Sequence, residues 1–80
     1  MHVAGVALTT TQVMVLADAL ERNRFYGLAG QLRKADSAGV HDLELTVDER
    51  DAVMRALDQG PAELADFRSV LLDRRAGRKR

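Results

Sequence analysis

Apolar residues recur every third or fourth position in four stretches of the chain, and this spacing predicts four amphipathic helices, each with one face to bury. Asn23 marks the joint between the first two helices. Gly60-Pro61 marks the joint between the last two, with Pro61 at a first-turn position where its missing amide costs nothing. The four apolar stripes are Val13-Leu16-Ala17-Leu20, Phe25-Leu28-Ala29-Leu32, Val53-Ala56-Leu57 and Leu64-Phe67-Val70-Leu71.

Two of the helix starts carry the same capping signal. Thr9 is followed three residues later by Gln12, and Thr46 is followed three residues later by Glu49. In such a capping box the Thr hydroxyl accepts a hydrogen bond from the third amide of the helix, while the Gln or Glu side chain accepts one from the amide of the Thr. The pattern therefore predicts that the first and third helices begin in the same way.

The two halves of the chain resemble each other beyond these caps. Sliding the sequence along itself places Leu8-Thr9 on Leu45-Thr46 and Ala19-Leu20 on Ala56-Leu57. We therefore predict a mainly α fold in which four helices form two pseudo-repeated helical hairpins. The predicted organisation is a single compact domain at 1–75, with halves 1–35 and 40–75 separated by the linker Asp36–Gly39, and a basic tail at 76–80. The repeat reflects either a duplication or two helix starts that obey the same physics.

Short segments with alternating apolar residues precede both capping boxes, and alternation is typical of a half-buried strand. The segments are Val3–Leu8 and Val40–Leu45. If both are strands, the simplest pairing is antiparallel about a pseudo-twofold axis, which gives a short two-stranded ribbon. Such a ribbon is marginal alone but persists when it packs on helices.

Composition bounds the environment and the assembly state. The 80 residues contain no Cys, which excludes disulfides and gives no sign of an oxidising compartment. We see neither an export signal nor an apolar run near the roughly 20 residues needed to cross a bilayer. We therefore expect a cytoplasmic protein without membrane contact. A domain of this size buries only roughly 60% of its unfolded surface, so self-association is an open option.

Candidate catalytic chemistry is sparse. His2 and His41 have no further ligand at metal-binding spacing, and Ser37 and Ser69 lack a neighbouring base. The acidic run 48–51 could be read as a carboxylate pair for acid-base work, but acidic side chains are also what the first turn of a helix prefers. We therefore expect no enzyme activity and no catalytic, metal or cofactor site.

Positive charge gathers in two places. Residues 1–73 carry 7 basic and 12 acidic residues, so an acidic body precedes a basic end. One interpretation is a nucleic-acid-binding regulator that uses the first hairpin as a helix-turn-helix surface and the end as a phosphate anchor. The other is a solvated helix face and a soluble terminus, which the acidic second half favours. The candidate residues are Arg22, Arg24, Arg33, Lys34, Arg74, Arg75, Arg78, Lys79 and Arg80.

The first helix has an unusually wide apolar face. Val13, Met14, Val15 and Leu16 are consecutive apolar residues, more than one narrow stripe requires. An apolar surface left exposed indicates an interface, although a wide stripe can also feed a small core. We favour a small non-enzymatic intracellular protein–protein interaction module whose partner is a larger protein or a second copy in a homodimer. The nucleic-acid-binding regulator is the alternative.

Overall fold

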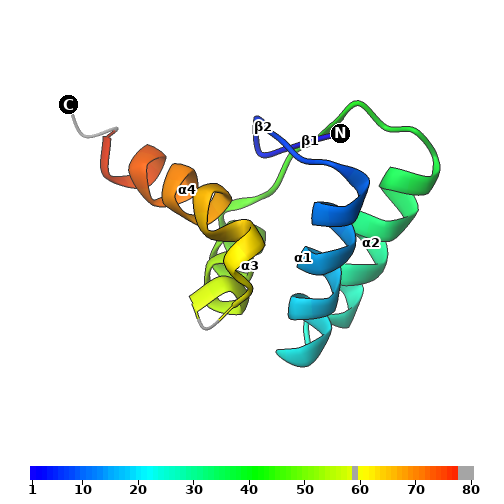
Figure 1. The fold of residues 1–80 in the computed structure, drawn as a ribbon, viewed down its shortest axis with the longest axis horizontal. Coiled ribbons are helices and arrows are strands. Elements are labelled where there is room, and N and C mark those ends of the chain that lie inside the picture. Colours follow the sequence, from blue (N-terminus) through cyan, green and yellow to red (C-terminus); the bar gives the residue numbers. More distant parts are fainter. Residues whose placement is uncertain (59, 78–80) are drawn as a thin grey trace.

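The computed structural model describes residues 1–58 and 60–77, with side chains up to residue 73. The described residues form four α-helices, one turn of 3₁₀ helix and a three-stranded sheet. Figure 1 shows α1 and α2 side by side at one end of the molecule, α3 and α4 at the other, and the sheet above them. The elements are β1 (His2–Val3), β2 (Val6–Ala7), α1 (Thr10–Arg22), α2 (Tyr26–Ser37), β3 (Asp42–Leu43), α3 (Val47–Asp58), η1 (Ala62–Leu64) and α4 (Ala65–Gly77).

The predicted helices are confirmed, and their apolar stripes form the core. Val13, Leu16 and Leu20 of α1 are fully buried, as are Leu32 of α2 and Val53 of α3. The buried residues from both halves of the chain belong to one cluster. Val3 of β1 and Leu8, which follows β2, contribute to this cluster, as do Leu64 of η1 and Phe67 and Leu71 of α4. Helix α1 packs against both α2 and α3 and is therefore the centre of the fold.

Both predicted capping boxes are formed. The Thr9 hydroxyl accepts from the Gln12 amide at 3.1 Å, and the Gln12 side chain accepts from the Thr9 amide at 2.8 Å. The Thr46 hydroxyl accepts from the Glu49 amide at 3.1 Å, and the Glu49 carboxylate accepts from the Thr46 amide at 2.9 Å. Each box satisfies two amides that would otherwise lack partners at a helix start.

Removing either cap hydroxyl is expected to lower the free energy of unfolding. Thr9→Ala and Thr46→Ala should each cost about 1 kcal/mol, because a first-turn amide loses its acceptor. Chemical denaturation measures the change. Thr10→Ala is the matched control, because Thr10 is exposed and lies just inside α1. It should change stability by less than about 0.5 kcal/mol; an equal loss in Thr10→Ala would contradict a capping role.

The predicted antiparallel ribbon between Val3–Leu8 and Val40–Leu45 is wrong. Strand β1 lies in the middle of the sheet, where it pairs antiparallel with β2 and parallel with β3. The segment Val3–Leu8 is not one strand, because it reverses direction at Ala4 and Gly5. Both residues have positive φ, 52° and 83°, as a two-residue type I′ hairpin turn requires. The first segment of the chain therefore forms a β-hairpin of β1 and β2, and β1 and β3 run in the same direction.

The predicted linker Asp36–Gly39 is half helical, since α2 continues to Ser37. Gly39 then adopts a φ of 76°, and the Gly39 and Val40 amides donate back to carbonyls of the last turn. This is a Schellman motif, in which a left-handed residue ends the helix. Helix α1 ends in the same way with Arg24 at a φ of 68°, a conformation that usually favours glycine.

Candidate protein-interaction surfaces

The structure divides the four interface candidates of α1 between core and surface. Val13 and Leu16 are fully buried, so they are unavailable to a partner and their assignment to an interface is corrected. Val15 is partly buried and packs against the core, whereas Met14 is 53% exposed. The face is wide because α1 must cover two neighbouring helices, α2 and α3. Most of the apolar width therefore serves the core.

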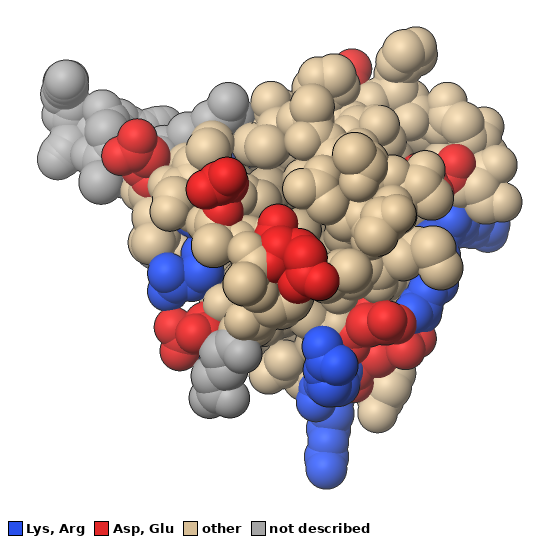
Figure 2. Space-filling view, in the orientation of Figure 1, with Lys and Arg blue, Asp and Glu red and all other residues tan. Residues whose placement is uncertain are grey.

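The exposed side chains in the first half of α1, up to Val15, belong to a surface without Asp, Glu, Lys or Arg. Residues 1–17 contain no Asp, Glu, Lys or Arg. Figure 2 shows the corresponding upper part of this face as largely uncharged, with acidic and basic side chains gathered below it. Apart from Met14, the exposed side chains here are small or polar, including Thr9, Thr10 and Thr11. This surface offers a partner one large apolar contact.

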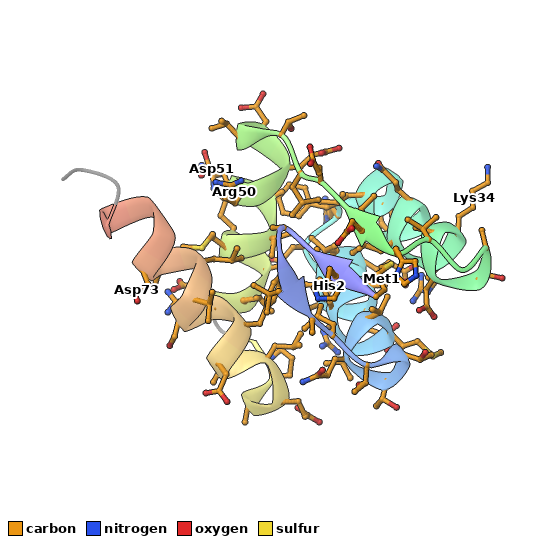
Figure 3. All side chains as sticks on the ribbon, turned by 90° about the horizontal axis from the view of Figure 1, so that it is seen from above. Met1, His2, Lys34, Arg50, Asp51 and Asp73 are labelled. Atoms are coloured by element: carbon orange, nitrogen blue, oxygen red, sulfur yellow. The ribbon has the colours of Figure 1, made fainter. Side chains whose placement is uncertain are left out.

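The basic residues of the first hairpin do not form one patch. Arg22 and Arg24 are exposed at the joint between α1 and α2, whereas Lys34 projects from the far end of α2 (Figure 3). Arg33 donates to Asp18 at 2.7 Å and also to Glu21. The hydrogen bond with Glu21 is the main reason why the pKa of Arg33 is raised. The positive charge of Arg33 is thus matched by two carboxylates of α1.

The arrangement of α1 and α2 also differs from a helix-turn-helix pair. The two helices lie side by side and antiparallel (Figure 1), whereas helix-turn-helix elements cross at about 90–120°. Ala29 and Leu32 of α2 are buried in the core rather than free for a groove. Of the predicted tail contacts, Arg78, Lys79 and Arg80 lie outside the described residues, and the side chains of Arg74 and Arg75 are not described.

A groove with a volume of about 550 Å³ lies between the start of α2 and the start of α3. The sequence did not indicate it. One wall carries neighbouring aromatic residues, and the other carries two carboxylates and a small residue; we call this feature the α2–α3 groove. Its lining consists of Arg24, Phe25, Tyr26, Gly27, Leu28, Gln31, Asp48, Glu49 and Ala52.

The turn after α1 presents the aromatic wall. The backbone of Arg24 adopts the left-handed conformation. The Phe25 amide can therefore donate to the Leu20 carbonyl at 2.9 Å, and the chain turns sharply into α2. Phe25 and Leu28 are then partly buried against the core, while Tyr26 is 63% exposed. The wall therefore has a fixed apolar base and one large side chain free to contact a partner.

The acidic wall comes from the first turn of α3. Glu49 is held by its capping hydrogen bond to Thr46, and Asp48 is exposed beside it. Their position in the first turn of α3 is favourable for negative charge. Because α1 packs against both α2 and α3, it holds the aromatic and acidic walls in one arrangement.

Other hollows and polar clusters offer less to a ligand. A smaller groove of about 400 Å³ between α3 and α4 has mixed charges, with Arg68 donating to Asp58 at 3.1 Å. The Nδ1 atom of His2, on the central strand β1, lies 3.8 Å from the Oδ1 atom of Asp42 on β3. Among the described residues, no group of three or more His, Cys, Asp or Glu is placed to hold a metal ion. Nor does the described part of the chain contain a helix long and apolar enough to span a bilayer.

The fold and its surface define a mainly helical domain with a small mixed sheet and an aromatic–acidic groove. Comparisons with protein-family models, with curated proteins and with solved structures found no match to this chain. The function is therefore argued from the residues of the chain itself.

Proposed function

We propose that this chain is a small non-enzymatic protein–protein interaction module of the cytoplasm, which binds a segment of a larger protein in the α2–α3 groove. The observation that carries the proposal is the 63% exposure of Tyr26 beside the partly buried Phe25 and Leu28. A large aromatic side chain left in solvent next to apolar neighbours gains free energy when a partner covers it.

The groove has the organisation of a small binding interface. Interfaces typically combine an apolar centre with a polar rim, and Tyr is among the residues that contribute most to binding. Here Phe25, Leu28 and Ala52 provide apolar surface, while Asp48 and Arg24 provide charges of both signs at the edges. The volume of about 550 Å³ suits a few side chains of a partner rather than a whole domain.

The two pseudo-repeated hairpins belong to the same proposal. The matching capping boxes at Thr9 and Thr46 support them. In the alignment of the halves, Asp48 stands where the first half has Thr11. The repeats would thus share a helix start but differ in surface, so that only the second contributes a carboxylate to the groove. The nucleic-acid alternative has less support, because Arg33 is paired with carboxylates, and Lys34 lies in the last turn of α2 whereas Arg24 precedes the first.

Affinity capture from the native lysate tests the proposal when three baits are compared. The intact chain should retain a protein partner. The Tyr26→Ala bait should retain at least about tenfold less of this partner, because truncation of a central aromatic residue removes much of the binding energy. Met14→Ala is the matched control, since Met14 is a similarly exposed apolar side chain away from the groove. It should retain the partner fully.

Two outcomes would contradict the proposed function. A partner lost from Met14→Ala but kept by Tyr26→Ala would place the interface on the uncharged surface of α1. Retention that depends on nuclease-sensitive material would favour the nucleic-acid alternative. Circular dichroism of each bait checks that the variants are folded. We expect both to be folded, because both substitutions are at exposed positions.

A further inference from the structure

The charge of this chain is divided so that one part complements another. The last seven residues contain five basic residues and no acidic one, whereas residues 1–73 contain 7 basic and 12 acidic residues. The segment 42–51 holds five acidic residues and one Arg, and two of these acidic residues, Asp48 and Glu49, line the groove. The chain therefore carries both a basic segment and an acidic surface for it to meet.

The α2–α3 groove suits a basic segment chemically. The exposed Asp48 carboxylate and the Glu49 carboxylate set two negative charges against the one positive charge of Arg24, so the groove attracts a further Arg or Lys side chain. Across the groove, the face of Tyr26 can accept a guanidinium through a cation–π contact. A carboxylate and an exposed aromatic ring on opposite walls can together recognise arginine, the carboxylate at the N–H edge of the guanidinium and the ring at its face.

The position of α4 determines which molecule supplies the segment. In both Figure 1 and Figure 3, α4 lies on the opposite side of α3 from α2. The groove opens between α2 and α3, so the described part of α4 lies on the side away from it. A second copy can approach the groove from its open side, whereas α4 of the same copy is separated from it by α3.

We propose that the basic segment 74–80 of a second copy occupies the α2–α3 groove. Reciprocal exchange, in which each copy places its segment in the groove of the other, closes a dimer with two identical contacts. The second contact forms within an already joined pair, so two weak contacts support one stable assembly. This inference rests on the proposed function, because the same groove serves both, and the dimer would keep the groove covered until a partner displaces the segment.

The mass of the intact chain in solution tests this inference. Light scattering should give close to twice the single-chain mass of 8.8 kDa at low salt. Because the contact is between exposed charges, the mass should fall to the single-chain value at high salt. A groove-reversed variant, Asp48→Lys with Gln31→Lys, and a tail-reversed variant, Arg78→Glu with Lys79→Glu and Arg80→Glu, should each be monomeric at low salt.

Mixing the two reversed variants gives the sharpest result. The positive groove of one variant now faces the negative segment of the other, and the remaining natural groove and segment also match. The mixture should therefore recover twice the single-chain mass although neither variant does so alone. Asp66→Lys is the matched control, because Asp66 is an exposed acid in the first turn of α4, remote from the groove. It should remain dimeric.

Other outcomes would overturn the inference. A wild-type chain that stays monomeric at every salt concentration excludes the exchange but leaves binding of a foreign protein in the groove intact. A dimer that survives in the groove-reversed variant, or a mixture that stays monomeric, places self-association elsewhere. Loss of both the dimer and the captured partner in Tyr26→Ala, with neither lost in Met14→Ala, supports the shared groove.

Discussion

Leu16→Ala is expected to lower the free energy of unfolding by about 2–5 kcal/mol. Leu16 is fully buried on α1, the helix that packs against both α2 and α3, so its truncation leaves a cavity at the centre of the core. For a domain whose total stability is on the order of 5–10 kcal/mol, this loss removes a large fraction of it. Urea denaturation followed by circular dichroism gives the change.

Met14→Ala is the control from the same helix. Met14 lies two residues before Leu16 but is 53% exposed, so the substitution should cost less than about 0.5 kcal/mol. The difference between the two variants tests which face of α1 is buried. Equal losses would contradict the assignment of Leu16 to the core and of Met14 to the surface.

Gly60→Ala is expected to cost about 1–3 kcal/mol, because it forces an extra carbon into a packed turn. A Cβ on Gly60 would lie 2.9 Å from the Leu57 Cα and 3.0 Å from the Ala56 carbonyl oxygen. Both contacts are with backbone, which cannot swing aside like the end of a long side chain. The joint before η1 would have to shift, and with it the entry into α4. Thermal unfolding should show a lower midpoint.

Gly30→Ala is expected to raise the midpoint of thermal unfolding, the opposite of Gly60→Ala. Gly30 lies inside α2, and an added Cβ there meets no described atom within 4 Å. Alanine favours the helix over glycine by roughly 0.5–1 kcal/mol, so this variant should be more stable than the wild type. If Gly60→Ala were neutral or Gly30→Ala destabilising, the packing described for these two positions would be wrong.

The parts of the fold that the sequence predicted are those set by local interactions. Helical spacing placed the buried stripes, and the Thr9 and Thr46 boxes marked two helix starts to the residue. The strand pairing was wrong because it depends on the Ala4-Gly5 turn, where a non-glycine residue adopts positive φ. The strands have only two residues each, so their alternating pattern was too short to reveal the turn.

The candidate site was harder to predict because no local pattern defines it. Tyr26 and Asp48 belong to different helices and line the same groove because α1 packs against both α2 and α3. Each residue also had an ordinary explanation at its own position, as a residue at a turn or as an acid in a first helical turn. The wide apolar face of α1 predicted an interface that included Val13 and Leu16, but both residues are buried where α1 packs against two helices.

Hydroxyl-radical footprinting of the complex recovered by affinity capture tests the central claim most directly, because it locates the covered surface. Tyr26 and Met14 are both exposed and both reactive, and they mark the groove and the uncharged surface of α1 respectively. Binding in the α2–α3 groove predicts that oxidation of Tyr26 is lower in the complex than in the single-chain form measured at high salt, while oxidation of Met14 is the same in both. Protection of Met14 with unchanged oxidation of Tyr26 would contradict the account.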